Sequence, residues 1–327
     1  MRYKRALRYL APNLLTGMNF VFGMLSLVAA HEGRHVDAGW LIIYAVLTDR
    51  LDGFVARLVR GTSELGVQLD SFADFLNFGV APAVLVYTAV GTKVEVFHGG
   101  TARVMLMLAC CAWILAAVFR LARYNITTED DPDKIFFGVP TTLIAGVFVI
   151  WFLALVKYSA EGAAMYDGSF GGMKLFGDIH TPDRIWHFVP VVMFVGAFLM
   201  ASNLRMPKLG LTSSRFATIF VFTNVFFGYV CGFARVFPEY MMWPPTAWVV
   251  LFLAWGALSP AARAMKPAPL FPPVDPAPGK EPRRPEDDLL PEGTDTSLDG
   301  APPASPPASP PESPAESPAS DLTEEKA

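Results

Sequence analysis

Four aspartates lie within the stretch DRLDGFVARLVRGTSELGVQLDSFAD, residues 49–74. Asp49 and Asp52 share one face of a helix, and Asp70 and Asp74 share a face of a second helix with Gly66. Carboxylate oxygens are hard ligands, and the stretch contains no His or Cys, so the pattern favours Mg²⁺ or Mn²⁺ over Zn²⁺. Because like charges beside apolar segments are costly without a counterion, the sequence predicts a divalent-metal site suited to phosphate groups.

The aspartates lie between long apolar runs. The chain has 327 residues, of which 53% are hydrophobic, and this is enough apolar sequence for several membrane spans. We predict an all-α, polytopic membrane helix bundle of about eight transmembrane helices, at roughly 12–30, 37–58, 66–90, 102–122, 138–156, 186–204, 215–234 and 243–262. The second and third spans carry the aspartates at their adjoining ends, so the acidic cluster is expected at one membrane surface.

Charge is divided unevenly along the chain. Residues 1–266 hold 22 basic and 17 acidic residues, whereas residues 267–327 hold four basic and 13 acidic residues. A basic membrane domain suits anionic lipid and phosphate substrates, although loop charges that set topology give the same sign. We expect a multi-pass protein of the cell inner membrane, and the Lys/Arg bias predicts that the acidic cluster and both termini lie in the cytoplasm.

The end of the chain differs from the rest in composition. From residue 267 onward it is rich in Pro, Ala and Ser with scattered acidic residues, and such a segment lacks the apolar content needed to form a core. We therefore expect two regions, a membrane-embedded domain at 1–266 and a disordered acidic tail at 267–327.

Written out in full, the aspartate stretch is Asp49-x2-Asp52-Gly53-x2-Ala56-Arg57-x8-Gly66-x3-Asp70-x3-Asp74. This pattern resembles the signature of the CDP-alcohol phosphotransferase family of integral membrane enzymes, and every signature position is filled. The resemblance implies that family's fold, a homodimer, a lipid bilayer environment and no nucleic acid partner. It also implies a reaction in which an alcohol displaces CMP from a CDP-linked donor.

The resemblance assigns a role to each signature residue. Asp49, Asp52, Asp70 and Asp74 would hold Mg²⁺ or Mn²⁺, with Asp70 and Asp74 catalytic and Asp74 the general base. The CDP-binding residues would be Gly53, Ala56, Arg57 and Gly66, together with Asn13 and Thr16 of the first span. Arg57 could instead neutralise the cluster or extend to the interface, and the polar residues of the first span could instead join helices.

Four further stretches resemble the phosphatidylserine synthases of this family, the CDP-diacylglycerol–serine O-phosphatidyltransferases. They are APNLLTGMN at 11–19, LDSFADFLNFGVAPA at 69–83, FRLARYN at 119–125 followed by FFGVPTT at 136–142, and MASNLRMPK at 200–208. The resemblance implies that CDP-diacylglycerol and L-serine are the substrates. Arg120 and Arg123 would bind the serine carboxylate and Asn125 its ammonium group, although both arginines also suit membrane topology alone.

Two alternatives stay open at this point. One is the same chemistry with another acceptor, such as inositol phosphate, glycerol phosphate or choline, or with an archaeal-type lipid donor. The other is an intramembrane cation-binding transporter, which would place its acidic residues near the middle of the bilayer and would have no requirement for cytidine.

Overall fold

The computed structural model describes residues 2–59, 64–127, 135–170, 172–207 and 215–264, and most of these are helical. The main helices are α1 (Arg2–His31), α2 (His35–Val59), α3 (Glu64–Asp74), α4 (Ala81–Lys93), α5 (Gly100–Thr127), α6 (Thr141–Lys157), α7 (Val189–Ala201), α8 (Arg215–Ala234) and α10 (Trp243–Leu258). Shorter elements are the π-helix η1 (Phe75–Val80), the 3₁₀ helices η2 (Glu95–Phe97) and η3 (Asp183–Phe188), and the short helices α9 (Pro238–Met241) and α11 (Pro260–Ala264). Two short strands, β1 (Ile135–Phe137) and β2 (Arg205–Pro207), pair antiparallel.

Several of these helices can cross a membrane. Within the described ranges, five segments are long and apolar enough, namely Leu14–His31, Leu65–Lys93, Gly100–Asn125, Asp183–Ala201 and Pro238–Leu258. Thr141–Lys157 and Thr218–Ala234 are apolar but shorter, and α2 carries charged residues towards both ends. The predicted all-α membrane fold is confirmed, whereas the number of eight spans stays a prediction.

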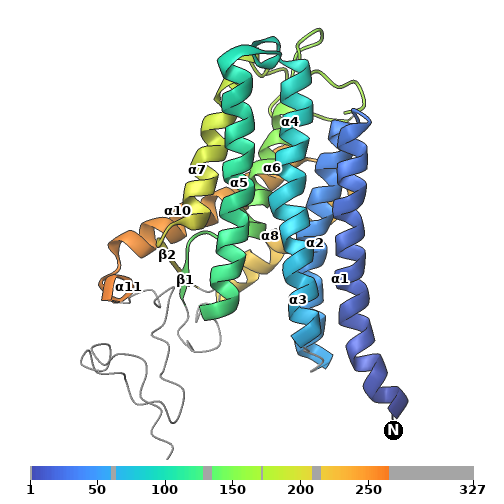
Figure 1. Ribbon diagram of the computed structural model, residues 1–327, viewed down its shortest axis with the longest axis vertical. Coiled ribbons are helices and arrows are strands. Elements are labelled where there is room, and N and C mark those ends of the chain that lie inside the picture. The colour runs from blue at the N-terminus through green and yellow to red at the C-terminus, as the bar shows by residue number, and fades with distance from the viewer. Residues whose placement is uncertain (1, 60–63, 128–134, 171, 208–214, 265–327) are drawn as a thin grey trace, which may run out of the picture. The chain divides into compact units, whose positions relative to one another are not determined.

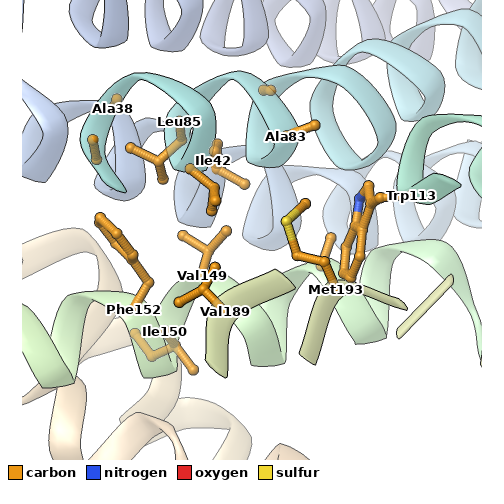
Figure 2. Packing of buried hydrophobic residues seen from close by; sticks show 14 of the residues in the cluster. Ala38, Ile42, Ala83, Leu85, Trp113, Val149, Ile150, Phe152, Val189 and Met193 are labelled. Carbon is orange, nitrogen blue, oxygen red and sulfur yellow. The ribbon is translucent and has the colours of Figure 1, made fainter. Parts of the chain in front are cut away.

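Helices α1, α2, α4, α5, α6 and α7 form an upright bundle in which α1 packs along α2, α2 contacts α6, and α5 packs along α7, whereas α10 runs obliquely to them (Figure 1). Buried side chains of α2, α4, α5, α6 and α7 meet in its centre, where Ile42, Leu85, Val149 and Met193 lie close together (Figure 2). Trp113 of α5 closes one side of this cluster and is fully buried. This packed centre fixes the positions of the helices relative to one another, and so fixes the helix ends that carry the aspartates.

The third predicted span is not a uniform α-helix, because η1 joins α3 to α4 with wider π-type turns. Pro82 has no backbone N–H, so in an α-helix the carbonyl of Phe78, four residues earlier, would lack its donor. The indole Nε1 of Trp113 donates to that carbonyl instead, at 3.0 Å. The Cβ of Ala117 lies 3.2 Å from where a Cβ at Gly79 would be, so α5 approaches the π segment closely.

Helix α1 is longer than the expected first span. It begins at Arg2, ten residues before the expected start of that span, and continues through Pro12. The expected tail at 267–327 lies outside the described residues, so the division into two regions stays a prediction.

At the end of the bundle where α6 finishes, a buried ion pair joins α6 to α9. Lys157 Nζ lies 2.8 and 3.1 Å from the two carboxylate oxygens of Glu239, and the two side chains are 4% and 0% exposed. Tyr158 Oη and the backbone N–H of Leu175 also donate to Glu239, at 3.3 and 3.1 Å. The segment between α6 and η3 is therefore attached to the helix ends by charge-assisted hydrogen bonds.

Candidate functional site

Three of the four aspartates bring their carboxylate groups together between α2 and α3. Asp49 of α2 and Asp70 and Asp74 of α3 each offer a carboxylate oxygen, and these three atoms lie within 4.8 Å of one another. Asp70 and Asp74 are one helical turn apart and so share a face of α3, while Asp49 approaches from the neighbouring helix. The structure thus brings these three predicted residues together. The side chain of Asp52 lies outside the described part of the structure.

The donor atoms of this cluster suit Mg²⁺ or Mn²⁺. All three donors are carboxylate oxygens, the ligand type that these cations prefer. Asp74 Oδ1 is buried and has no hydrogen-bond partner among the described residues, so one oxygen has the burial and vacancy expected of a metal ligand. A buried carboxylate oxygen without a partner is costly, and a bound divalent cation would remove that cost.

Helix α6 begins beside the acidic cluster. The Thr142 hydroxyl and the Asp74 carboxyl both hydrogen-bond to Asp49. Thr141, the first residue of α6, accepts a hydrogen bond from Arg120 Nη1 of α5 at 2.8 Å. The first turn of this 17-residue helix has no side-chain cap. A helix start of this kind carries partial positive charge and suits an anionic group.

Arg120 is the buried positive charge next to the aspartates. It is only 8% exposed, it interacts electrostatically with Asp74 and Asp49, and its guanidinium lies over the Tyr124 ring. Its Nε is buried and has no hydrogen-bond partner within the described residues. Arg120 therefore has donor capacity left beside the acidic cluster, where an anionic substrate group would need it.

Arg123 lies one turn further along α5 and points to a different set of partners. Its Nη1 donates to Asn203 Oδ1 at 3.0 Å, and its Nη2 donates to the carbonyls of Ser202, at 3.0 Å, and Phe137. Gly138, which follows Phe137, has φ +79°, and a Cβ there would lie 2.8 Å from Arg123 Nη2. Arg123 thus ties α5 to the segments around β1 and β2. Its predicted contact with serine stays a prediction.

The other predicted residues lie around this centre. Asn125 Nδ2 donates to the hydroxyl of Ser71 at 3.1 Å, and Ser71 directly follows Asp70. Thr16 is buried on α1, while Gly53 and Gly66 are half-buried. The side chains of Asn13, Ala56 and Arg57 fall outside what the structure describes. The assignment of these residues to a nucleotide pocket stays a prediction.

Sequence reasoning did not assign roles to Thr141 and Thr142, although the stretch that contains them, FFGVPTT, carries part of the resemblance. It also missed the group formed by Asn19, Thr48 and Asn77, which lies next to the aspartates. Two features of the sequence place this group near the aspartates. Thr48 directly precedes Asp49, and Asn77 is the first polar residue after Asp74.

The segment that contains these residues matches known proteins. The family model for CDP-alcohol phosphatidyltransferase matches residues 9–173, which include the four aspartates of the motif. A CDP-diacylglycerol–serine O-phosphatidyltransferase of Helicobacter pylori is 36% identical over 150 residues, covering 46% of this chain and 60% of that protein. A protein of the same name from Saccharomyces cerevisiae is 31% identical over 211 residues, covering 60% of this chain and 67% of that protein.

An archaetidylserine synthase of Methanothermobacter thermautotrophicus is 34% identical over 168 residues, covering 50% of this chain and 66% of that protein. The chain thus spans between half and two thirds of the length of the curated relatives it matches. The family model covers half of the chain and spans the residues that form the acidic cluster. The chain belongs to the CDP-alcohol phosphatidyltransferase family.

Proposed function

We propose that this protein transfers the phosphatidyl group of CDP-diacylglycerol to the hydroxyl of L-serine, which gives phosphatidylserine and CMP. The observation that carries the proposal is the meeting of Asp49, Asp70 and Asp74 within 4.8 Å of one another in the segment that the family model matches. Relatives at 36% and 31% identity carry the name of this activity, which supports serine as the acceptor.

The acidic cluster would bind the reacting end of the donor. Asp49, Asp70 and Asp74, with Asp52 as a further ligand, would hold Mg²⁺ or Mn²⁺, which when bound neutralises charge on the diphosphate. Arg120 and the start of α6 add positive charge on the neighbouring side. We therefore place the donor diphosphate beside the aspartates and the start of α6, where the metal and Arg120 would offset its negative charge.

The proposed reaction is one in-line displacement at the phosphorus that carries the diacylglycerol. Asp74 accepts the proton of the serine hydroxyl as the serine oxygen forms its bond to phosphorus. The bond from that phosphorus to the bridging oxygen breaks, and CMP leaves with the bridging oxygen and the electron pair. We give Asp74 the role of base because it lies in the cluster itself and fills the last aspartate position of the motif.

Serine would bind through its carboxylate. Arg120 has unused donor capacity and lies beside Asp74, so we assign it the main contact with the carboxylate. Arg123 would contribute mainly by fixing the segments around Phe137 and Asn203. Asn125, which is bonded to Ser71, would contact the serine ammonium group.

An apolar cavity of about 190 Å³ would receive part of an acyl chain of the donor. It lies between α2, α6, α8 and α10, and its lining includes Arg50 and Thr142, next to the acidic cluster. The remaining lining is mostly apolar, including Val46, Val147 and Phe252. A lipid whose diphosphate is at Asp49 would reach this cavity without leaving the membrane.

The proposal includes the setting of the enzyme. The protein would be a homodimer of the cell inner membrane, with the acidic cluster and both termini in the cytoplasm. The Lys/Arg bias of the expected inner loops supports the orientation, and cysteine labelling from either side of sealed vesicles would test it.

The decisive experiment measures CMP release by purified protein with CDP-diacylglycerol, Mn²⁺ and a panel of labelled alcohols. We expect release with L-serine, a lipid product that retains the serine amine, and a loss of at least about 100-fold in Asp74→Asn. Use of glycerol phosphate or inositol phosphate, with no use of serine, would refute the proposed acceptor.

A second candidate keeps serine and changes the donor. One relative is named an archaetidylserine synthase, so a CDP-activated archaeal-type ether lipid is the alternative donor. Competition between the two donors at equal concentration would separate these candidates. A preference of tenfold or more for the ether lipid would favour the second.

A further inference from the structure

Three buried polar residues form a junction next to the acidic cluster. Asn19 of α1, Thr48 of α2 and Asn77 of η1 are 0%, 3% and 0% exposed. Thr48 directly precedes Asp49, and Asn77 follows Asp74 by three residues, or about one helical turn. The junction therefore connects the two helical segments that carry the predicted metal ligands.

Asn19 is the shared partner within this polar junction. Asn77 Nδ2 donates to Asn19 Oδ1 at 3.0 Å and to the Asn19 backbone carbonyl at 3.1 Å. Thr48 Oγ1 lies 3.2 Å from the same Asn19 Oδ1 and 2.8 Å from the carbonyl of Tyr44. One carboxamide oxygen of α1 thus binds both α2 and η1, and it fixes their relative height.

Because Gly23 has no side chain, the carboxamide of Asn77 fits against α1 at this position. A Cβ at position 23 would lie 1.9 Å from Asn77 Oδ1, closer than any real contact of this kind. The carboxamide of Asn77 therefore lies directly against the backbone of α1, one turn after Asn19. Any larger residue at position 23 would displace it.

The junction is costly to maintain for a purely structural contact. Asn19 Nδ2 and Asn77 Oδ1 are both buried without a hydrogen-bond partner among the described residues, and each such group costs about 1–3 kcal/mol. Asn77 also lies in a π-helical segment, a rare geometry that often occurs at functional sites. Apolar side chains would join these three helices at lower cost, which points to a role beyond packing.

We propose that Asn77, through Asn19 and Thr48, is a positioning residue that sets the distance of Asp74 from Asp49 and so determines metal affinity. Asn77 and Asp74 move together because α3 continues directly into η1. Thr48 moves with Asp49 because the two are neighbours in α2. This inference rests on the proposed function for the presence of the metal. It is independent of which alcohol the enzyme uses.

The test measures Mn²⁺ binding directly, without substrates, by electron paramagnetic resonance and by the rise in Tm on adding Mn²⁺. We expect Asn77→Leu to weaken Mn²⁺ binding by about 10-fold or more, as for the loss of other groups that orient metal ligands. In turnover assays at saturating Mn²⁺, its KM for serine should stay within about twofold. The matched control is Ser26→Ala, which removes another buried α1–α2 hydrogen bond, from Ser26 Oγ to the Ala38 carbonyl at 3.0 Å.

Gly23 supplies a second test that does not depend on Asn77→Leu folding. Gly23→Ala should weaken Mn²⁺ binding as strongly as Asn77→Ala does, because its methyl group displaces the carboxamide. In the double variant, the methyl group occupies space that the carboxamide has left, so the two effects should not add. The control is Gly39→Ala, where the new Cβ would meet Leu153 Cδ2 at 2.8 Å, and it should lower Tm without changing Mn²⁺ affinity.

Two outcomes would overturn the inference. One is Mn²⁺ affinity in Asn77→Leu equal to that of the parent protein, and the other is additive effects of Gly23→Ala and Asn77→Ala. The proposed function fails separately, if the parent binds Mn²⁺ and yet does not transfer the phosphatidyl group to serine.

Discussion

Replacing Glu239 by Gln should destabilise the protein strongly and leave its chemistry intact. Lys157 is 4% exposed at its side chain and Glu239 is fully buried, so the variant leaves a buried ammonium group without its counterion. Gln has nearly the same shape and keeps an acceptor for Tyr158 Oη and the Leu175 N–H. The perturbation is therefore the loss of one charge and of the acceptor oxygen 3.1 Å from Lys157 Nζ, where Gln places an amide NH₂ group.

The expected loss is about 3–5 kcal/mol, the usual cost of removing one partner of a buried ion pair. At about 2–4 °C per kcal/mol for a domain of this size, Tm should fall by roughly 6–20 °C. Lys157 and Thr141 stand at opposite ends of α6, and 16 residues of helix span about 24 Å. At temperatures below the transition, kcat/KM should therefore stay within about twofold of the parent value.

The assay is a thermal melt in detergent, followed by tryptophan fluorescence, beside turnover at 25 °C. The control is the double variant Lys157→Met with Glu239→Gln, which removes both charges and should recover most of the lost Tm. A fall in Tm of less than about 2 °C in the single variant would show that the unpaired buried charge costs the folded protein little. A melting temperature as low in the double variant as in the single one would refute the argument equally.

Three further predictions concern other parts of the molecule. Arg123→Lys should lower Tm by several degrees, because Lys cannot reach Asn203, Ser202 and Phe137 together. Arg120→Lys should instead raise the KM for serine by about 10-fold or more, with a smaller change in Tm. Equal effects of the two variants on KM would contradict the different roles given to the two arginines. Removal of divalent cations with EDTA should lower Tm and abolish turnover, and Mn²⁺ should restore both; an unchanged Tm would argue against a metal at the aspartates. Burial raises the pKa of Tyr158, so the folded protein holds this proton more tightly than the unfolded chain. The resulting stability is present below about pH 10 and is lost as pH rises further. Tm should therefore fall more steeply above pH 10 in the parent than in Tyr158→Phe, and parallel Tm profiles would exclude a contribution from Tyr158.

Part of the aspartate cluster follows from the local sequence alone. The spacing of Asp70 and Asp74 by four residues places them on one helix face whatever the tertiary fold. The apolar runs on either side of the motif likewise require membrane helices, because a lipid-exposed backbone must satisfy its own hydrogen bonds. Both features follow from local geometry and composition.

The partners of the two arginines of α5 could not be predicted from the sequence. Arg120 and Arg123 are three residues apart and looked equivalent in the sequence, yet one faces the aspartates and Thr141, and the other binds carbonyls near β1 and β2. Side chains of this length reach partners set by neighbouring helices, and no pattern within α5 specifies which helix start or strand lies beside each residue.

The sequence by itself determined the membrane class, the all-oxygen side chains of the aspartate motif and the family, because each depends on residue type and short-range spacing. Only the tertiary structure decided that Asp49 meets Asp74, that α6 begins at the cluster, and that Asn77 contacts α1 at Gly23. These contacts join residues 25 to 93 positions apart in the chain. They depend on how whole helices pack, and packing is a property of the complete core rather than of any one segment.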